Sequence, residues 1–220
     1  MYKKKKIFAL IPARSGSKRL PKKNIKLFYK KPLIYWSIKV AQTSKYIDDV
    51  YVTTDDKKIK KIAIKCRAKV PFLRSKKNSR DVSPSEDFII EFLNKIQIDY
   101  DYLILLQPTS PLRKKEEIQS SIKKIIDRNY KSFVSITNPK KIRISSFKHK
   151  KIIKNLVKYI NNRKYLINGS IYILKIKHFL KSKKIIDQNT KYFETNIKSS
   201  VDIDTKNDFE LAELIKKNEI

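Results

Sequence analysis

Cysteine and long apolar runs are scarce in this sequence of 220 residues. Its one cysteine, Cys66, excludes a framework of internal disulfides and fits a reducing compartment. Cys66 lies at an apolar position of a helix-like segment, so we expect a buried, unreactive thiol. The apolar runs, such as 102–106, are far too short to cross a bilayer, and Pro12 ends the first one too early for a signal peptide. We therefore expect a cytoplasmic protein that does not bind a membrane.

Acidic residues are also few, with 21 Asp and Glu against 53 Lys and Arg, which gives a formal net charge of +32. Such a charge raises the hypothesis of a nucleic-acid-binding protein. The lysines, however, are scattered along the whole chain beside many Ile and Asn, as a biased base composition would leave them. We expect mostly solvated lysines and no nucleic-acid partner, with a local excess that attracts anionic substrates.

The length and the balance of 40% apolar to 34% charged residues indicate one globular domain covering residues 1–220. Strand-like segments alternate with segments of helical period. The expected strands are 6–11, 49–54, 70–73, 102–107, 133–137, 171–174 and 192–197. The expected helices are 32–41, 57–66, 85–96, 116–128 and 205–215. This order predicts an α/β fold with a mostly parallel sheet, and the pattern loosens into an excursion at about 138–170.

The loop at 11–24 directly follows the first strand, at the sheet edge where ligands of open α/β folds bind. Arg14, Lys18, Arg19 and Lys23 add positive charge to this small polar turn. These features are typical of a site for a polyphosphate, although the spacing is neither that of a P-loop nor that of a dinucleotide fingerprint.

Glycine is rarer still: Gly16 and Gly169 are the only two in the chain. A composition this poor in glycine should keep it where a side chain cannot be tolerated, either for a positive φ or for close approach of a ligand. Gly16 lies in the middle of the basic loop, which supports the anion site, although a simple tight turn would need glycine equally.

Two later stretches carry polar side chains at the ends of strands. Gln107 ends the most apolar strand and is followed by two prolines, so its amide would be presented in a fixed place to read hydroxyl groups; an incidental turn residue is the alternative. Asp202 and Asp204 lie two positions apart on an extended segment and should point the same way. Such a carboxylate pair favours Mg²⁺, unless Asp204 merely caps the helix that follows.

Six segments, taken in order, resemble the CMP-N-acetylneuraminate synthetases, the acylneuraminate cytidylyltransferase family that includes enzymes for legionaminic and pseudaminic acids. They are the basic loop at 11–24, Pro-Leu-Ile-Tyr-Trp-Ser-Ile at 32–38, Val-Thr-Thr-Asp at 52–55, Leu-Gln-Pro-Thr-Ser-Pro at 106–111, Asn-Gly-Ser-Ile-Tyr at 168–172 and Asp-Ile-Asp at 202–204. The resemblance implies a Rossmann-like nucleotidyltransferase sheet, transfer of CMP from CTP to an acidic nine-carbon sugar, and a homodimer formed through the excursion at 138–170.

The resemblance also implies residue roles. The expected nucleotide-binding residues are Arg14, Ser15, Gly16, Ser17, Lys18, Lys23, Asn24, Arg74 and Ser83. The expected sugar-binding residues are Gln107, Thr109, Ser110, Arg163, Asn168 and Gly169. Lys18, Arg14, Asp202 and Asp204 would be catalytic, and the two aspartates would hold Mg²⁺.

Departures from the family pattern concern the sugar. Kdo cytidylyltransferases usually carry Pro where this chain has Asn24, and pseudaminic acid enzymes usually place His-Asp-Ala-Gly where Asn168 and Gly169 stand. Both differences favour a sialic or legionaminic acid, with Kdo and pseudaminic acid as alternatives. The family's usual Arg before the Asn-Gly pair is Ile167 here, so Arg163 or Lys164 is left to meet the sugar carboxylate.

Overall fold

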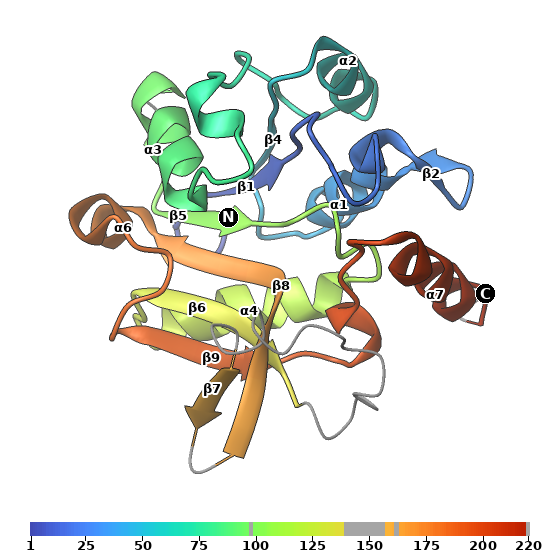
Figure 1. Ribbon diagram of the computed structural model, residues 1–220. Helices are drawn as coiled ribbons and strands as arrows, with labels where there is room; N and C mark the ends of the chain where they lie inside the picture. Colours follow the sequence, from blue (N-terminus) through green and yellow to red (C-terminus); the bar gives the residue numbers. More distant parts are fainter. Residues whose placement is uncertain (97–98, 139–156, 161–162, 219–220) are drawn as a thin grey trace.

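The computed structural model describes residues 1–96, 99–138, 157–160 and 163–218, and at 157–160 and 163–164 it describes the backbone alone. Figure 1 shows one central sheet with helices on both faces. Seven strands form this sheet in the order β4-β1-β5-β8-β6-β9, with β7 paired to β8. They are β1 (Ile7–Pro12), β4 (Asp49–Thr53), β5 (Tyr102–Leu105), β6 (Ser132–Thr137), β7 (Val157–Ile160), β8 (Arg163–Lys175) and β9 (Thr190–Glu194).

The predicted, mostly parallel sheet is confirmed. β1 pairs in parallel with β4 and β5, and β6 with β9, whereas β8 runs antiparallel between β5 and β6. The carboxyl ends of β1, β4 and β5 therefore meet at one edge, where the loops that follow them can share a site. A separate hairpin, β2 (Leu27–Phe28) with β3 (Lys31–Pro32), follows the basic loop.

Six α-helices are described. They are α1 (Leu33–Gln42), α2 (Lys57–Lys65), α3 (Ser85–Ile96), α4 (Lys115–Asp127), α6 (Ile176–Ser182) and α7 (Lys206–Lys217). Three short 3₁₀ turns add Lys23–Ile25, Lys77–Ser79 and Lys198–Ser200. Asp56 caps α2 and Thr205 caps α7, each by accepting backbone N–H bonds, so the predicted start of the last helix is confirmed.

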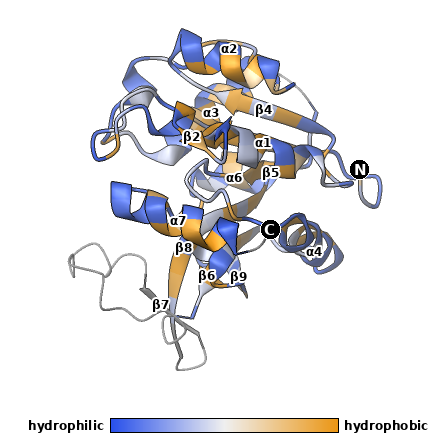
Figure 2. Ribbon diagram, turned by 90° about the vertical axis from the view of Figure 1, so that its right-hand side faces the viewer, coloured by the Kyte–Doolittle hydropathy of each residue, from blue (hydrophilic) through white to orange (hydrophobic). Residues whose placement is uncertain are grey.

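Strand β1 contributes side chains to two hydrophobic cores, one on each face of the sheet. Ile7, Ala9 and Ile11 face the apolar sides of α1, α2 and α4, while Phe8 and Leu10 face α3 and α6, because successive side chains of a strand point to opposite faces. All five are completely buried. Figure 2 shows the result as apolar strands between helices whose outer faces are hydrophilic. A third cluster joins α7 to the β2–β3 hairpin through Phe28 and Phe209.

The strand predicted at 70–73 is wrong. The segment beside β4 forms only isolated bridges, at Lys69 with Tyr51 and at Leu73 with Thr54. Pro71 stands between them and has no N–H to continue the ladder. Helix α6 was not predicted, and β8 begins well before the predicted 171, at Arg163.

Most of the excursion predicted at 138–170 lies outside the described residues, apart from residue 138, β7 and the first part of β8. Its role in a dimer stays a prediction. Cys66 is half-buried rather than fully buried, and burial raises the pKa of its thiol. Within the part of the chain that the structure describes, no helix combines the length and apolarity that a membrane crossing requires.

Candidate functional site

A cavity of about 610 Å³ opens where β1 and β5 end. The loops after both strands line it, together with the segment before α3 and the segment before α7. The residues predicted from the sequence that line this cavity are Arg14, Ser17, Lys18, Lys23, Asn24, Arg74, Ser83, Gln107, Thr109, Asp202 and Asp204. The tertiary structure therefore brings the predicted nucleotide, sugar and metal groups to one place.

The basic loop after β1 is held by hydrogen bonds to its neighbours. Ala13 N donates to Thr53 O over 2.9 Å, and the backbone N–H and hydroxyl of Ser15 donate to the Asp55 carboxylate over 2.9 and 2.8 Å. Asn24 Nδ2 donates to Arg14 O over 2.9 Å. Ser15 and Asn24 thus fix the loop backbone, and Ser15 does not line the cavity.

Gly16 also lies outside the cavity wall. A Cβ atom built on it would find no described atom within 4 Å, and its φ is not in the left-handed region. The protein around it therefore gives no steric reason for glycine. A positive φ is therefore not the reason for Gly16, and the approach of a ligand to it stays a prediction.

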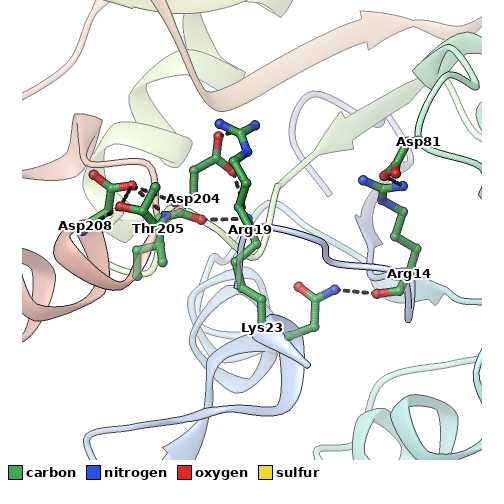
Figure 3. A network of polar contacts seen from close by, with 9 residues as sticks. Arg14, Arg19, Lys23, Asp81, Asp204, Thr205 and Asp208 are labelled. Carbon is green, nitrogen blue, oxygen red and sulfur yellow. Dashed lines mark hydrogen bonds and ion pairs between the residues drawn. The ribbon is translucent and has the colours of Figure 1, made fainter. Parts of the chain in front are cut away.

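Four cations of the loop are paired with carboxylates of the same chain, and Figure 3 shows Arg14 with Asp81 and Arg19 and Lys23 with Asp204. Asp81 forms ion pairs with Arg14 and with Lys18, the latter over 2.8 Å, and these two cations hold the pKa of Asp81 below its ordinary value. Asp204 accepts from Arg19 and from Lys23, each over 2.9 Å. Four cations of the loop are thus paired with two carboxylates at the cavity.

Asp202 and Asp204 face the same cavity, as their spacing predicted. Ile203 between them points into the core and is completely buried, and its N–H donates to Thr109 O over 2.8 Å. Asp202 reaches solvent in the cavity, but protein surrounds it elsewhere. This burial, helped by the nearby charge of Asp204, raises the pKa of Asp202 to about 6, against the opposing effects of Thr109 and Lys23. A nearby cation would favour its ionised form.

The donor set suits Mg²⁺ better than a fully protein-ligated metal. Among the described residues no group of three or more His, Cys, Asp or Glu side chains could hold an ion. Mg²⁺ is commonly bound by one or two carboxylates plus substrate phosphates and water. Asp202 and Asp204 supply those two carboxylates, although Arg19 and Lys23 already share the second.

Arg74 lies at the wall of the cavity and is 5% exposed. It donates to the Thr53 carbonyl and hydroxyl over 2.6 and 3.2 Å, and its guanidinium lies 4.5 Å from the centre of the Phe88 ring. Burial lowers the pKa of Arg74 to about 10, so it stays charged at neutral pH. It adds a fixed positive charge near the start of the basic loop, because the Thr53 carbonyl that it contacts also accepts from Ala13 N.

The strand end at Gln107 rests on a buried arginine that the sequence did not single out. Arg113 is 5% exposed and donates to Gln107 O, Ser170 O and Ser37 Oγ over 2.9, 2.8 and 3.2 Å. No carboxylate within the described residues forms an ion pair with it, and burial lowers its pKa to about 9. The only signal in the sequence was a cation following an apolar, proline-rich turn.

Gly169 packs against the Gln107 side chain. Its φ is +71°, and a Cβ atom there would lie 3.5 Å from Gln107 Oε1. The positive φ is therefore the reason for glycine at this position, and the neighbouring group is a side chain of the protein itself.

Three residues predicted to bind the sugar are placed behind the cavity wall. The amide of Asn168 is 8% exposed and is used internally, accepting from Ser135 and donating to Thr195 and Ser200 over 2.6, 2.8 and 3.0 Å. Ser110 is fully buried and Gly169 does not line the cavity. Arg163 begins β8, and its side chain lies outside the described part of the structure.

Asn78, Arg80 and Asp81 line the cavity but were missed. A single acidic residue after a basic run at 74–80 was the available signal. Its position opposite the first loop depends on α3, because Glu91 of that helix accepts hydrogen bonds from Ser75 and Asn78 over 2.7 to 3.0 Å.

Residues 8–220 match the family model described as Cytidylyltransferase. The chain belongs to the cytidylyltransferase family. It is 39% identical over 222 residues to CMP-N,N'-diacetyllegionaminic acid synthase of Legionella pneumophila, covering 94% of this chain and 95% of that protein. It is 31% identical to a pseudaminic acid cytidylyltransferase of Campylobacter jejuni, covering 96% and 97%. The resemblance seen in the sequence is confirmed.

An N-acylneuraminate cytidylyltransferase of Escherichia coli is 35% identical over 97% of this cytidylyltransferase, which spans only 53% of that longer protein. Among solved structures, CMP:2-keto-3-deoxy-manno-octonic acid synthetase in complex with CTP superposes with a TM-score of 0.74 and 17% identity, covering 98% and 100%. At this identity the superposition supports the nucleotidyltransferase fold alone.

Proposed function

We propose that this cytidylyltransferase transfers CMP from CTP to an acidic nine-carbon 3-deoxy sugar of the N-acetylneuraminic or legionaminic type and releases pyrophosphate. The observation that carries the proposal is the cavity itself, where a cationic loop, a carboxylate pair and the Gln107 amide face one another. A triphosphate needs the first two features, and a polyhydroxylated sugar needs the third.

The reaction is an attack of the sugar's anomeric hydroxyl on the α-phosphorus, with pyrophosphate leaving. Lys18 and Arg14 would neutralise charge on the departing pyrophosphate, which is the form of catalysis expected where positioning and electrostatics dominate. Arg74 would add a further cationic contact to the nucleotide from the cavity wall. Ser15 and Asn24 would act by fixing the loop backbone, in agreement with their hydrogen bonds.

Asp202 and Asp204 would hold Mg²⁺, which when bound polarises phosphate oxygens and lowers the pKa of a coordinated hydroxyl. Lys23 and Arg19 already hold Asp204 in a fixed orientation. Asp202 would be the more available ligand, since a cation beside it relieves the cost of its ionisation.

The sugar is inferred from two sources. Asn24 and the Asn168–Gly169 pair match the sialic and legionaminic enzymes in the sequence, and the Legionella relative is named for N,N'-diacetyllegionaminic acid. Gln107 and Thr109 are the predicted sugar-binding residues that line the cavity. Kdo and pseudaminic acid are the alternative substrates.

The test measures pyrophosphate release from CTP and Mg²⁺ with N-acetylneuraminic acid, N,N'-diacetyllegionaminic acid, pseudaminic acid and Kdo in parallel. We expect turnover with one of the first two. Lys18→Ala and Asp202→Asn should each lower kcat/KM by about 100-fold or more, the typical loss of one transition-state contact. Lys57→Ala and Asp127→Asn, which remove the same charges outside the cavity, are the matched controls. Full turnover by Lys18→Ala or Asp202→Asn would contradict the roles assigned here.

A nucleic-acid-binding protein remains the hypothesis from a different class, and membership of an enzyme family disfavours it. A salt titration with random DNA separates the two. Tight, sequence-independent binding at physiological salt without CTP turnover would favour that alternative. We further propose that the protein is a homodimer, which rests on the resemblance at 138–170. We propose a cytoplasmic location on the basis of the single cysteine.

A further inference from the structure

The loop cations that should bind the triphosphate already have an anionic partner in the chain. Asp81 gives one carboxylate oxygen to Arg14 and the other to Lys18, the latter over 2.8 Å. All three residues line the cavity. A carboxylate shared by two cations is geometrically similar to a phosphate group held by the same two cations, because both present two oxygens to two donors.

Asp81 belongs to a short exposed segment that local bonds shape. Ser83 donates from its backbone to Arg80 O over 3.2 Å and from its hydroxyl to Lys77 O over 2.7 Å. Val82 beside Asp81 is 86% exposed and packs against little. The Asp81 and Arg14 side chains are 31% and 34% exposed, so solvent and ligands can reach the pair.

The segment is nevertheless tied to the body of the protein. Glu91 of α3 fixes Ser75 and Asn78 a few residues earlier, so Asp81 can separate from the cations without leaving the cavity wall. Its negative charge would then remain near the bound polyphosphate.

We propose that Asp81 sets the affinity for polyphosphate by competing with it for Arg14 and Lys18, and that its return to them promotes release of pyrophosphate. This inference rests on the proposed binding of CTP. Polyphosphate binding must break the two ion pairs that Asp81 makes with Arg14 and Lys18. The apparent affinity for polyphosphate is therefore lowered by the free energy of these two pairs. Asp204, which also holds two loop cations, differs because it would bind the proposed metal as well.

The proposal predicts an unusual direction of change: removing a charged residue from the cavity should tighten binding. Asp81→Asn keeps the shape of the side chain but removes its charge. We expect it to bind pyrophosphate and CTP roughly three- to tenfold more tightly than the natural protein, the range for two partly exposed ion pairs. CMP, which lacks the β- and γ-phosphates, should change much less.

The experiment is isothermal titration of pyrophosphate, CTP and CMP into the natural protein, Asp81→Asn, Asp81→Glu and Asp127→Asn, without divalent metal. Asp127, the last residue of α4, pairs with Lys3 outside the cavity, so its variant controls for net charge. Asp81→Glu should stay near the natural affinity. In turnover assays Asp81→Asn should show a lower KM for CTP and stronger inhibition by pyrophosphate.

Unchanged or weaker pyrophosphate binding by Asp81→Asn, relative to Asp127→Asn, would overturn the proposal. Failure of the proposed function looks different. If the natural protein turns over no CTP with any sugar but Asp81→Asn still tightens pyrophosphate binding, the competition stands and the enzymatic assignment falls.

Discussion

At the scale of single residues, two buried polar side chains support the cavity without lining it. Arg113 and Asn168 form hydrogen bonds with other residues of the chain. Each joins segments that are far apart in the sequence. Buried polar atoms must be paired because an unpaired one costs free energy. Both residues therefore hold in place the segments that carry the residues of the cavity wall.

Replacing Arg113 by Met should lower the free energy of unfolding by about 1–3 kcal/mol, since the Gln107 and Ser170 carbonyls each lose a buried donor, offset in part by removal of a buried charge. Urea titration measures this. Arg128→Met, at an exposed cation, is the control. An Arg113→Met protein as stable as the natural one would contradict the structural role.

Asn168→Ala should also destabilise the protein, by about 1–3 kcal/mol, because Ser135, Thr195 and Ser200 lose their shared partner. Asn168→Asp should be no better, since a carboxylate cannot donate to Thr195 and Ser200. The comparison is made by thermal unfolding without sugar, with Asn94→Ala, at an exposed position of α3, as control. A variant that unfolds normally but loses sugar affinity would instead support the sugar-binding role predicted from the sequence.

At the scale of elements, α3 decides where one wall of the cavity lies. Glu91 on this helix has a side chain that is only 10% exposed, and it accepts bonds from Lys95, Ser75 and Asn78. Despite burial, these partners lower the pKa of Glu91 to about 2. The helix thus holds the segment that carries Asp81 through one ionised group.

Stability should therefore depend on pH through Glu91. A carboxyl whose pKa is lowered by folding stabilises the protein above its unfolded value of about 4.5, and this contribution is lost as pH falls towards about 2. The difference in unfolding free energy between the natural protein and Glu91→Gln should be full above about pH 5 and shrink below it. Glu210→Gln, at an exposed pair with Lys206, should show no such trend. A difference independent of pH would exclude this linkage.

At the scale of the whole molecule, the net charge of +32 acts on stability as well as on ligands. Like charges on a folded surface repel one another, and salt screens them. The same field attracts a polyanion towards the cavity. The many lysines along the chain therefore affect both the stability of the fold and the attraction of anionic ligands.

The unfolding free energy should rise when NaCl increases from about 20 mM to about 200 mM, as screening shortens the reach of the repulsion. A variant with Lys57→Glu, Lys61→Glu and Lys65→Glu on the exposed face of α2 should respond less to salt. Urea titrations at each salt concentration measure both. A natural protein that loses stability with added NaCl would show that attractive pairs outweigh the net repulsion.

The sequence by itself determined the alternation of strands and helices, the parallel sheet and the positions of the basic loop and the aspartate pair. These follow from local periodicity, turn chemistry and the rule that loops after parallel strands share one edge. It was wrong at 70–73, where Pro71 breaks a ladder that apolar residues alone would favour.

Only the tertiary structure decided which polar residues face the cavity and which support it. Asn168 and Ser15 carry the right chemistry in the right motifs, but neighbours distant in sequence consume their hydrogen bonds. Asp81 and Arg113 gave weak signals because their partners lie far along the chain. The partner of a charged side chain depends on how distant segments pack together, so a local sequence pattern cannot predict it.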